Sequence, residues 1–282
     1  MNRLATALLA AATTAGAAAV LRARQPGGSW RWRRTNYRGR EVDLLGGVAT
    51  AAGAATGALA CGGAAGAGAT VVTTTAGLLG AIDDADVDST SKGLRGHLSA
   101  LQQGRVTTGL VKLVGISSAA LVASAVATGF GRRGAPAEAV PGWAERAVDV
   151  AGSGVLIAAT ANLVNLFDLR PGRALKLVGL VCAPLAAAAP GPSGRVAGAA
   201  LGAVVASWEG DLGEETMLGD AGANALGALT GTALALLGSA RARAVATGTA
   251  VGLVLLSEKV SFSRVIATTP GLREFDAWAR IG

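Results

Sequence analysis

The 282-residue sequence has little of what soluble enzymes use most. It contains one histidine, two cysteines, 15% charged residues and 4% aromatic residues, whereas a soluble domain carries about 25% charged residues. One histidine is too few for a zinc site built on histidines. Cys61 and Cys182 both fall inside apolar stretches, so we expect neither a disulfide nor a metal-binding pair. The shortage of charge argues against a water-soluble domain.

The sequence has long apolar blocks rich in alanine and glycine instead. A helix needs about 20 apolar residues to cross the hydrocarbon core of a membrane, and small residues let such helices approach closely. We therefore predict an all-α, polytopic transmembrane helical bundle. It forms one membrane domain over residues 1–282, with a cytoplasmic tail over 258–282. About nine spans are predicted, at 2–21, 42–61, 63–82, 106–129, 148–167, 174–190, 195–208, 221–239 and 244–257.

The charged residues predict the orientation of these spans. Most of the 25 lysine and arginine residues fall in the loops after the odd-numbered spans, which places those loops in the cytoplasm. The N-terminus is then outside and the C-terminus is cytoplasmic. The first block is also compatible with a signal peptide, but the basic run that follows it favours a span. Membrane topology accounts for the net charge of +7, so no nucleic-acid partner is predicted.

The acidic residues gather on the same side as the basic ones. Of 18 acidic residues, only Glu138, Glu145 and Asp149 lie on the other side. The positive-inside rule does not require this, because acids contribute little to topology. A basic loop recruits acids for solubility as well, but these acids cluster at span ends. The clustering indicates a polar site at the cytoplasmic face.

The first cluster is the pair Asp83 and Asp84 at the end of the third span. Adjacent carboxylates at a helix end suit Mg²⁺, which binds one or two carboxylates and takes its other ligands from water and substrate phosphates. A solvated helix end is the simpler interpretation. Lys92, Arg95 and His97 follow the pair, and their cations suit an anionic lipid headgroup or a diphosphate. Anchoring of the loop in the cytoplasm explains Arg95 equally well.

The second cluster is Asn162, Asn165 and Asp168 at the end of the fifth span. The spacing of three places these side chains along one face of a helix. Polar side chains inside a membrane helix are costly without partners. Hydrogen bonds between helices explain the two asparagines adequately, and they explain Asp168 less well.

The third cluster is Asp220, flanked by Gly219 and Gly222, at the start of the eighth span. A carboxylate there lies near free backbone N–H groups, a location that favours anions and phosphate. Capping of the helix is the simpler role. Lys112 lies about two turns into the fourth span and either reaches the surface or neutralises acids in the bundle.

In order and spacing, these motifs resemble those of the polyprenyl-phosphate N-acetylhexosamine-1-phosphate transferases, the MraY/WecA-like enzymes of glycosyltransferase family 4. The likeness runs from about residue 36 to residue 260. It rests on the Asp83–Asp84 pair, the Asn-x-x-Asn-x-x-Asp element ending at Asp168, the Gly-Asp-x-Gly element around Asp220, and Lys112. Family members transfer the phosphosugar of a UDP-sugar to a polyprenyl phosphate, release UMP, use Mg²⁺, and begin lipid-linked cell-envelope synthesis.

The resemblance implies a role for each matching residue in a multi-pass plasma-membrane transferase with a cytoplasmic active site. Asp83, Asp84, Asp168 and Lys112 would be catalytic. Asp220 and Asp84 would hold the metal. The nucleotide-sugar and the lipid phosphate would be bound by Asn162, Asn165, Lys92, Arg95, His97 and Gly222.

The chain departs from the family pattern at several places. Pro171 stands where the family has a second aspartate, which contributes to nucleotide recognition there; the family's histidine-rich last loop and tenth span are missing. These departures favour an alternative, a non-catalytic relative that binds a lipid phosphate or supports an envelope assembly complex. An ion transporter ranks third, because its acids would line a path near the bilayer midplane. The sugar and the oligomeric state stay open, a homodimer among the options.

Overall fold

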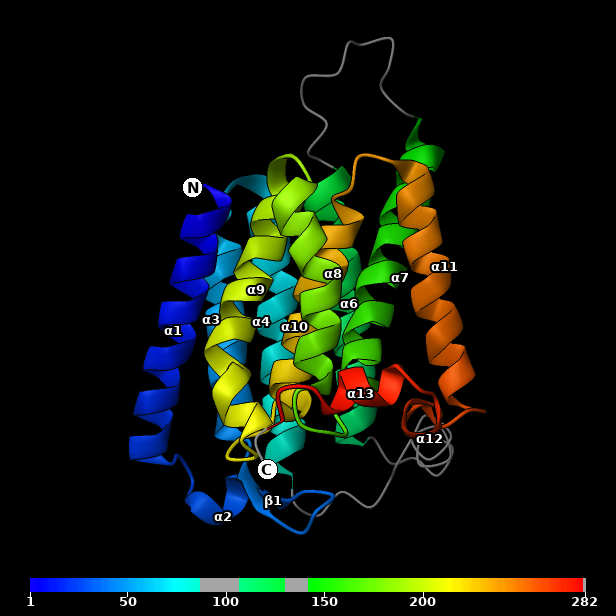
Figure 1. Cartoon of the computed structure of the whole chain (residues 1–282). Coiled ribbons are helices and arrows are strands. Elements are labelled where there is room, and N and C mark those ends of the chain that lie inside the picture. Colours follow the sequence, from blue (N-terminus) through cyan, green and yellow to red (C-terminus); the bar gives the residue numbers. More distant parts are fainter. Residues whose placement is uncertain (87–106, 130–141, 281–282) are drawn as a thin grey trace.

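A computed structural model describes residues 1–86, 107–129 and 142–280. Most of these residues lie in long helices that share one axis and alternate in direction (Figure 1). The long helices are α1 (Arg3–Arg24), α3 (Leu45–Ala60), α4 (Gly63–Ala85), α6 (Thr108–Ser124), α7 (Trp143–Phe167), α8 (Arg173–Ala188), α9 (Gly191–Leu212), α10 (Gly219–Ala235) and α11 (Ala240–Ser257). The short elements are α2 (Ser29–Trp32), β1 (Arg33–Thr35), β2 (Glu41–Asp43), the π-helix η1 (Ala125–Gly129), α12 (Phe262–Thr268) and α13 (Leu272–Ala277).

Within the described residues, four helices are long and apolar enough to cross a membrane. They are α1, α4, α7 and the helix Thr108–Ala127, which joins α6 to part of η1. Each predicted range overlaps one long helix, so the predicted helical class is confirmed. The remaining long helices are shorter or less apolar. The count of nine crossings stays a prediction.

Several predicted boundaries move by a few residues. The prediction of a span starting at residue 42 is wrong, because residues 41–43 form strand β2 and the helix starts at Leu45. The last long helix starts at Ala240 rather than at 244, because the Ser239 side chain accepts a hydrogen bond from the Ala242 N–H at 3.2 Å and caps it. The predicted tail is not featureless, since it contains α12 and α13.

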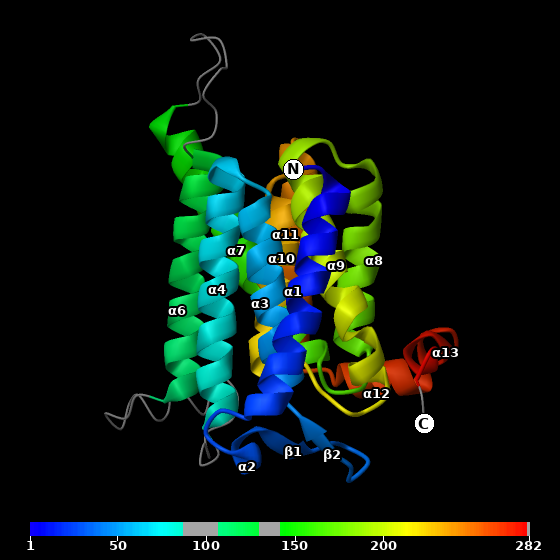
Figure 2. The same ribbon diagram turned by 90° about the vertical axis from the view of Figure 1, so that its left-hand side faces the viewer.

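The two ends of the bundle differ. The N-terminus lies at one end, and the hairpin β1–β2, α12 and α13 lie at the other (Figures 1 and 2). The ends of α4, α7 and α9 and the starts of α6, α8 and α10 meet at this second end, which we call the site end. That the site end faces the cytoplasm stays a prediction.

Helix α10 forms the centre of the bundle. Nearly all of its residues are buried, and it packs against α3, α4, α7 and α9. Small residues make this possible, because Gly227 and Gly231 lie directly against the backbone of α7 at Ala161 and Ile157. Close backbone approach of this kind is how helices associate in membranes, where apolar burial adds little driving force.

Helix α1 packs against α3 and α9, as a span of the bundle does. The backbone of α1 at Arg3 and Ala7 lies against Gly198 and Gly202 of α9. The Arg3 guanidinium also donates to the carbonyl oxygens of Ala186 and Ala189 at 2.7 and 2.6 Å, near the end of α8. Arg3 therefore satisfies carbonyls that a helix C-terminus leaves free.

The hairpin covers part of the site end. Strands β1 and β2 pair antiparallel, with Arg33 opposite Asp43 and Thr35 opposite Glu41. Asp43 also forms a bridge to Thr216 in the loop between α9 and α10. The hairpin and this loop, residues 213–218, therefore hold each other in place beside the start of α10.

Candidate functional site

Residues from three predicted motifs meet at the site end. The Lys112 ammonium of α6 donates to Asp83 of α4 at 2.7 Å and also contacts the carboxylate of Asp220, in the first turn of α10. The three side chains are largely shielded, with 17%, 18% and 25% of Lys112, Asp83 and Asp220 exposed. Charges in such a place require partners, so Lys112 neutralises acids within the bundle rather than reaching the surface.

Asp84 points away from Lys112 and caps helix α10. Its two carboxylate oxygens accept hydrogen bonds from the backbone N–H groups of Asp220 and Ala221, at 3.0 and 2.9 Å. Gly80, one turn earlier on α4, leaves room for the backbone of Asp220 to approach. The prediction that Asp84 binds a metal stays a prediction. In this structure both of its oxygens are already engaged by α10.

Two further carboxylates surround the start of α10. Asp168 follows the last residue of α7 and interacts with the backbone N–H of Gly219. Asp211, near the end of α9, accepts a hydrogen bond from Gly172 at 2.5 Å and interacts with the backbone N–H of Leu218. The positive end of a helix dipole stabilises anions, so α10 gathers carboxylates from α4, α7 and α9 around its N-terminus.

Sequence reasoning missed Asp211. No motif surrounds it, and Glu209, Glu214 and Glu215 lie close to it in the sequence, so no local signal distinguishes it from these acids. Asp211 joins the loop at Gly172 to the loop before α10, so we assign it a positioning role.

The other predicted residues have less specific places. Asn162 and Asn165 are half-buried on α7, and their side chains make no hydrogen bond within the described residues. Gly222 lies against Gly47 of α3, so its observed role is helix packing rather than contact with a ligand. Lys92, Arg95 and His97 lie outside the described residues.

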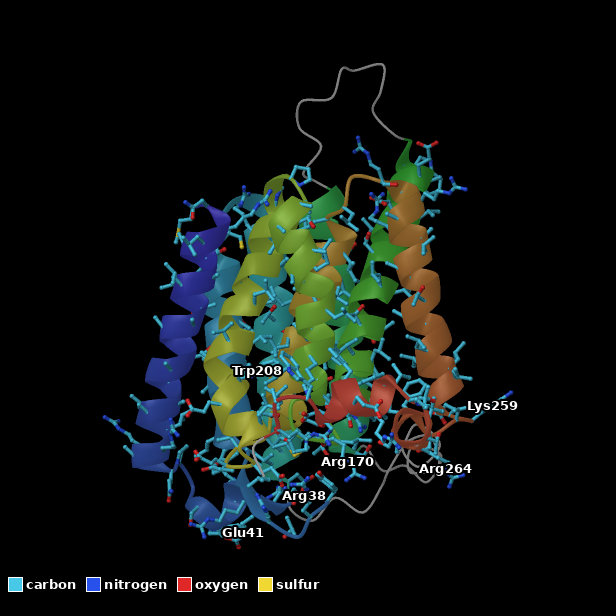
Figure 3. The ribbon with its side chains drawn as sticks, viewed as in Figure 1. Arg38, Glu41, Arg170, Trp208, Lys259 and Arg264 are labelled. Atoms are coloured by element: carbon cyan, nitrogen blue, oxygen red, sulfur yellow. The ribbon has the colours of Figure 1, made fainter. Side chains whose placement is uncertain are left out.

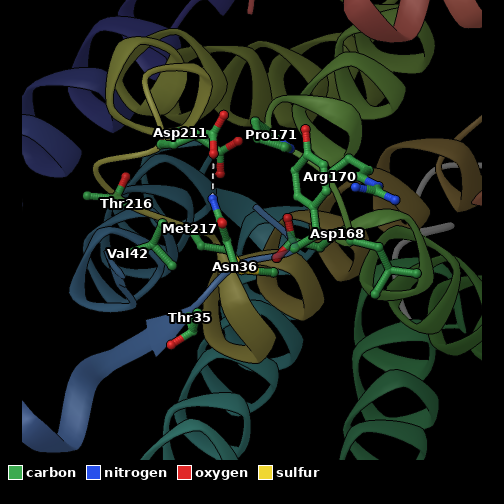
Figure 4. Close-up of a pocket in the computed structure, with 12 residues that line it drawn as sticks. Thr35, Asn36, Val42, Asp168, Arg170, Pro171, Asp211, Thr216 and Met217 are labelled. Carbon is green, nitrogen blue, oxygen red and sulfur yellow. Dashed lines mark hydrogen bonds between the residues drawn. The ribbon is translucent and has the colours of Figure 1, made fainter. Parts of the chain in front are cut away.

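A cavity of about 240 Å³ opens beside these acids. Figure 4 shows Asp168 and Arg170 on one side of it and Thr35 and Thr216 on the other. One carboxylate oxygen of Asp168, Oδ2, is buried and has no hydrogen-bond partner. Unpaired buried acceptors are costly, so this oxygen suits a ligand that donates a hydrogen bond.

The rim of the cavity is basic and aromatic. The Arg170 guanidinium stacks on the Tyr37 ring at 3.6 Å, and that of Arg38 lies 5.4 Å from the same ring. Arg170 and Tyr37 line the cavity, and Figure 3 shows Arg38 and Arg170 at the site end. Guanidinium groups recognise phosphates well because of their planar set of donors.

Glu214 fixes the hairpin against the loop before α10. Its side chain is 1% exposed and lies 2.8 Å from Arg38 and 4.0 Å from Arg40. It also accepts a hydrogen bond from the Asn36 amide at 2.5 Å. A buried charge is tolerated when it is paired and hydrogen-bonded, and this arrangement keeps the cavity wall closed on the hairpin side.

No three histidine, cysteine, aspartate or glutamate side chains within the described residues lie close enough together to hold a metal by themselves. The convergent donors are the carboxylates of Asp83 and Asp220. A cation bound there would have two protein carboxylates and would take its other ligands from water and substrate.

The fold places the chain in the class of α-helical proteins with helices that can span a membrane, and its polar site lies at one end of the bundle. Comparison with protein-family models, with curated proteins and with solved structures finds no match. The family resemblance therefore rests on the motifs.

Proposed function

We propose that the chain is a membrane transferase that moves a sugar 1-phosphate from a UDP-sugar to a polyprenyl phosphate and releases UMP. The observation that carries the proposal is the convergence of Asp83, Lys112 and Asp220, which come from three separate helices, beside a cavity lined by Asp168. The polar site at a bundle end suits a reaction that joins a lipid to a water-soluble donor. The chain would cross the plasma membrane nine times and carry its active site on the cytoplasmic side. The reaction would be the first step of lipid-linked cell-envelope glycan synthesis.

Mg²⁺ fits the donor set of this site. The carboxylates of Asp83 and Asp220 both contact the Lys112 ammonium, so the two carboxylates converge on one point. Mg²⁺ binds to such a pair, because it takes one or two carboxylates together with substrate phosphates. When bound, the metal would neutralise charge on the transferred phosphoryl group. Asp84 supports the site by holding the start of α10, which carries Asp220.

The residues of the chain would act mainly by positioning. In the reaction, an oxygen of the lipid phosphate bonds to the sugar-bearing phosphorus while the bond from that phosphorus to UMP breaks. A phosphate monoester has a second pKa of about 6 and is already largely ionised near neutrality, so orientation by Asp83 matters more than proton removal. Lys112 supplies a fixed cation for the anionic substrates.

The cavity beside the acids is the candidate site for the nucleotide. The unpartnered Oδ2 of Asp168 would accept a hydrogen bond from an N–H or O–H of the nucleoside. Arg170 and Arg38, held on the Tyr37 ring, lie where a diphosphate would enter. Pro171 cannot supply a carboxylate, so recognition of the base falls to other lining groups.

A non-catalytic relative that binds a lipid phosphate is the second candidate. One observation favours it, namely that Lys112 already pairs with both Asp83 and Asp220. One ammonium serves both carboxylates in this arrangement, without a metal or a substrate.

Release of a mononucleotide by the purified protein tests the proposal. The full chain in detergent would receive Mg²⁺, a polyprenyl phosphate and a panel of nucleotide-sugars. We expect release that requires both lipid and metal and that falls at least about 100-fold in Asp220→Asn, the loss typical of a group that stabilises transition-state charge. Asp149→Asn is the matched control, because Asp149 pairs with Arg243 at 2.5 Å in a part of the bundle remote from the site.

Two outcomes would count against the transferase. Equal mononucleotide release from Asp220→Asn and from the parent chain would show that this site does not take part in the reaction. No release across the panel, from folded protein that still binds polyprenyl phosphate, would favour the non-catalytic relative.

A further inference from the structure

The segment after α11 exposes several apolar side chains. Val265, Leu272, Phe275 and Trp278 are all exposed, Trp278 by 59%. Neither α12 nor α13 contains a buried residue, and Trp208, which meets the Trp278 ring, leaves most of that side chain uncovered. Apolar groups that gather in this way indicate a binding surface rather than chance exposure.

The segment is nevertheless firmly attached to the bundle. Asp276 accepts hydrogen bonds from Arg173 at 2.8 and 2.9 Å and from Arg280 at 2.6 Å. The Lys176 ammonium donates to the Asp276 carbonyl at 2.7 Å. These bonds turn Asp276 toward the start of α8. Leu272 and Phe275 stay exposed, as do Arg273 and Glu274, which pair with each other.

Aromatic contacts fix the level of the segment along the bundle axis. Trp278 packs edge-on against Trp208 of α9 at 6.0 Å, and Phe262 packs against Phe167 of α7 at 5.4 Å. Figure 3 shows Trp208 near the site end, at the level of α13. Tryptophan is enriched where a membrane meets water, so the segment lies at the depth expected of the headgroup region.

The exposed apolar surface continues from α11 into this segment. Leu255 and Leu256 are exposed in the last turn of α11. Lys259 and Arg264 follow, and their side chains are exposed (Figure 3). The acidic residues of the segment offset the charges of Lys259 and Arg264 only in part. Asp276 and Glu274 are already paired with arginines, and Glu258 alone stays exposed without a pair in the described residues. Cations beside exposed aromatics suit anionic lipid headgroups.

We propose that residues 259–280 form an interfacial segment that lies in the headgroup region of the membrane at the site end. Leu272, Phe275 and Trp278 enter the boundary of the acyl chains, and Lys259 and Arg264 contact anionic headgroups. The proposal requires the bundle to be in a membrane, and it does not depend on the proposed transferase activity.

A fluorescent probe that senses its environment tests this placement. The full chain carrying Phe275→Cys would be labelled and placed in lipid nanodiscs. The native Cys61 and Cys182 are buried, which favours labelling at the new position. The matched control is Glu41→Cys, which lies at the same end of the bundle on the hairpin, with a side chain 72% exposed. Leu272→Cys repeats the test independently if Phe275→Cys does not fold.

We expect a blue-shifted emission at position 275 and strong quenching by lipids brominated near the headgroup. We expect neither effect at position 41. Adding phosphatidylglycerol to the nanodiscs should increase the shift at 275, and Lys259→Gln with Arg264→Gln should abolish that increase. A probe at 275 as water-exposed as the probe at 41 would overturn the proposal, and the apolar face would then require a protein partner.

Discussion

Helices α10 and α11 follow each other in the chain and have nearly equal lengths, 17 and 18 residues, yet their surroundings are opposite. Almost every residue of α10 is buried, whereas Ala250 alone is buried among the residues of α11. Both helices are rich in alanine and contain glycines. Gly227 of α10 touches the backbone of α7, but Gly248 and Gly252 of α11 have no atom within 4 Å of an added Cβ.

Small residues therefore permit a central position but do not determine it. The two helices differ at their first turns. Carboxylates from α4, α7 and α9 converge on the first turn of α10. The first turn of α11 has one ion pair instead, from Arg243 to Asp149 of α7. Polar contacts at one end select which helix occupies the centre, and small side chains then allow it to pack there.

The largest expected difference in stability concerns the ion pair at each helix, which is Asp220 of α10 with Lys112 and Arg243 of α11 with Asp149. Lys112→Met removes the cation shared by Asp83 and Asp220 and leaves two shielded carboxylates facing each other. We expect it to lower the free energy of unfolding by about 3–5 kcal/mol. Asp149→Asn breaks a single pair between α7 and α11, whose Arg243 and Asp149 side chains are 12% and 27% exposed. It should cost less, about 1–2 kcal/mol, because the Arg243 guanidinium keeps its hydrogen bond to the Leu237 carbonyl. Denaturation of the detergent-solubilised protein measures both changes.

The control for that prediction is a double variant. Adding Asp83→Asn to Lys112→Met removes one of the uncompensated charges and should restore part of the stability. Equal losses for Lys112→Met and Asp149→Asn would show that the acids at α10 are not coupled through Lys112.

A smaller difference is expected for an added side chain on each helix. Gly227→Leu would push α10 away from Ala161 and should cost about 1–3 kcal/mol, as overpacking does. Gly252→Leu on α11 meets open space and should change stability by no more than about 0.5 kcal/mol. The midpoint of thermal unfolding in one detergent compares them. A neutral Gly227→Leu would contradict the central packing of α10.

The smallest expected effect concerns the segment that follows α11 and depends on pH. Burial opposes ionisation of Asp276, but the hydrogen bonds and charges of Arg173 and Arg280 outweigh it and hold the pKa of Asp276 below its usual 3.8. A depressed pKa stabilises the fold above pH 3.8, and this stabilisation is lost as the pH falls through the lowered value. Asp276→Asn should therefore cost about 1 kcal/mol at neutral pH.

The measurement is thermal unfolding of the parent chain and Asp276→Asn at several pH values. The gap between their midpoints should be constant above pH 4 and shrink in stronger acid. A gap that widens as the pH falls would contradict the assigned ion pair.

The sequence predicted the helices well, because long apolar blocks are visible without knowledge of contacts. It also pointed to Asp83, Lys112 and Asp220, which the structure brings together, because their places on the spans put them at one end. It did not predict the hairpin at β1 and β2, whose short strands have too few residues for a clear alternation. Nor could it predict that Asp84 faces α10 while Asp83 faces Lys112. Adjacent residues on a helix point about 100° apart, and the packing of α4 decides which one meets which neighbour.

Asp211 and Glu214 were missed for a related reason. Each is one acid among several in residues 209–215, and only the fold shows that these two side chains are buried. Their partners, Gly172 and Asn36, are distant in the sequence. Pairings over such distances are properties of the folded chain and leave no local pattern.

The contact of Arg3 with the end of α8 also bears on how the protein is made. Its guanidinium and the Ala186 carbonyl are separated by 183 positions in the chain, and α9, the helix against which α1 packs, is synthesised later still. During synthesis α1 is made long before these partners exist, and α3 is the first of its two packing neighbours to follow. The packing around α1 is therefore completed only after α9 has been synthesised.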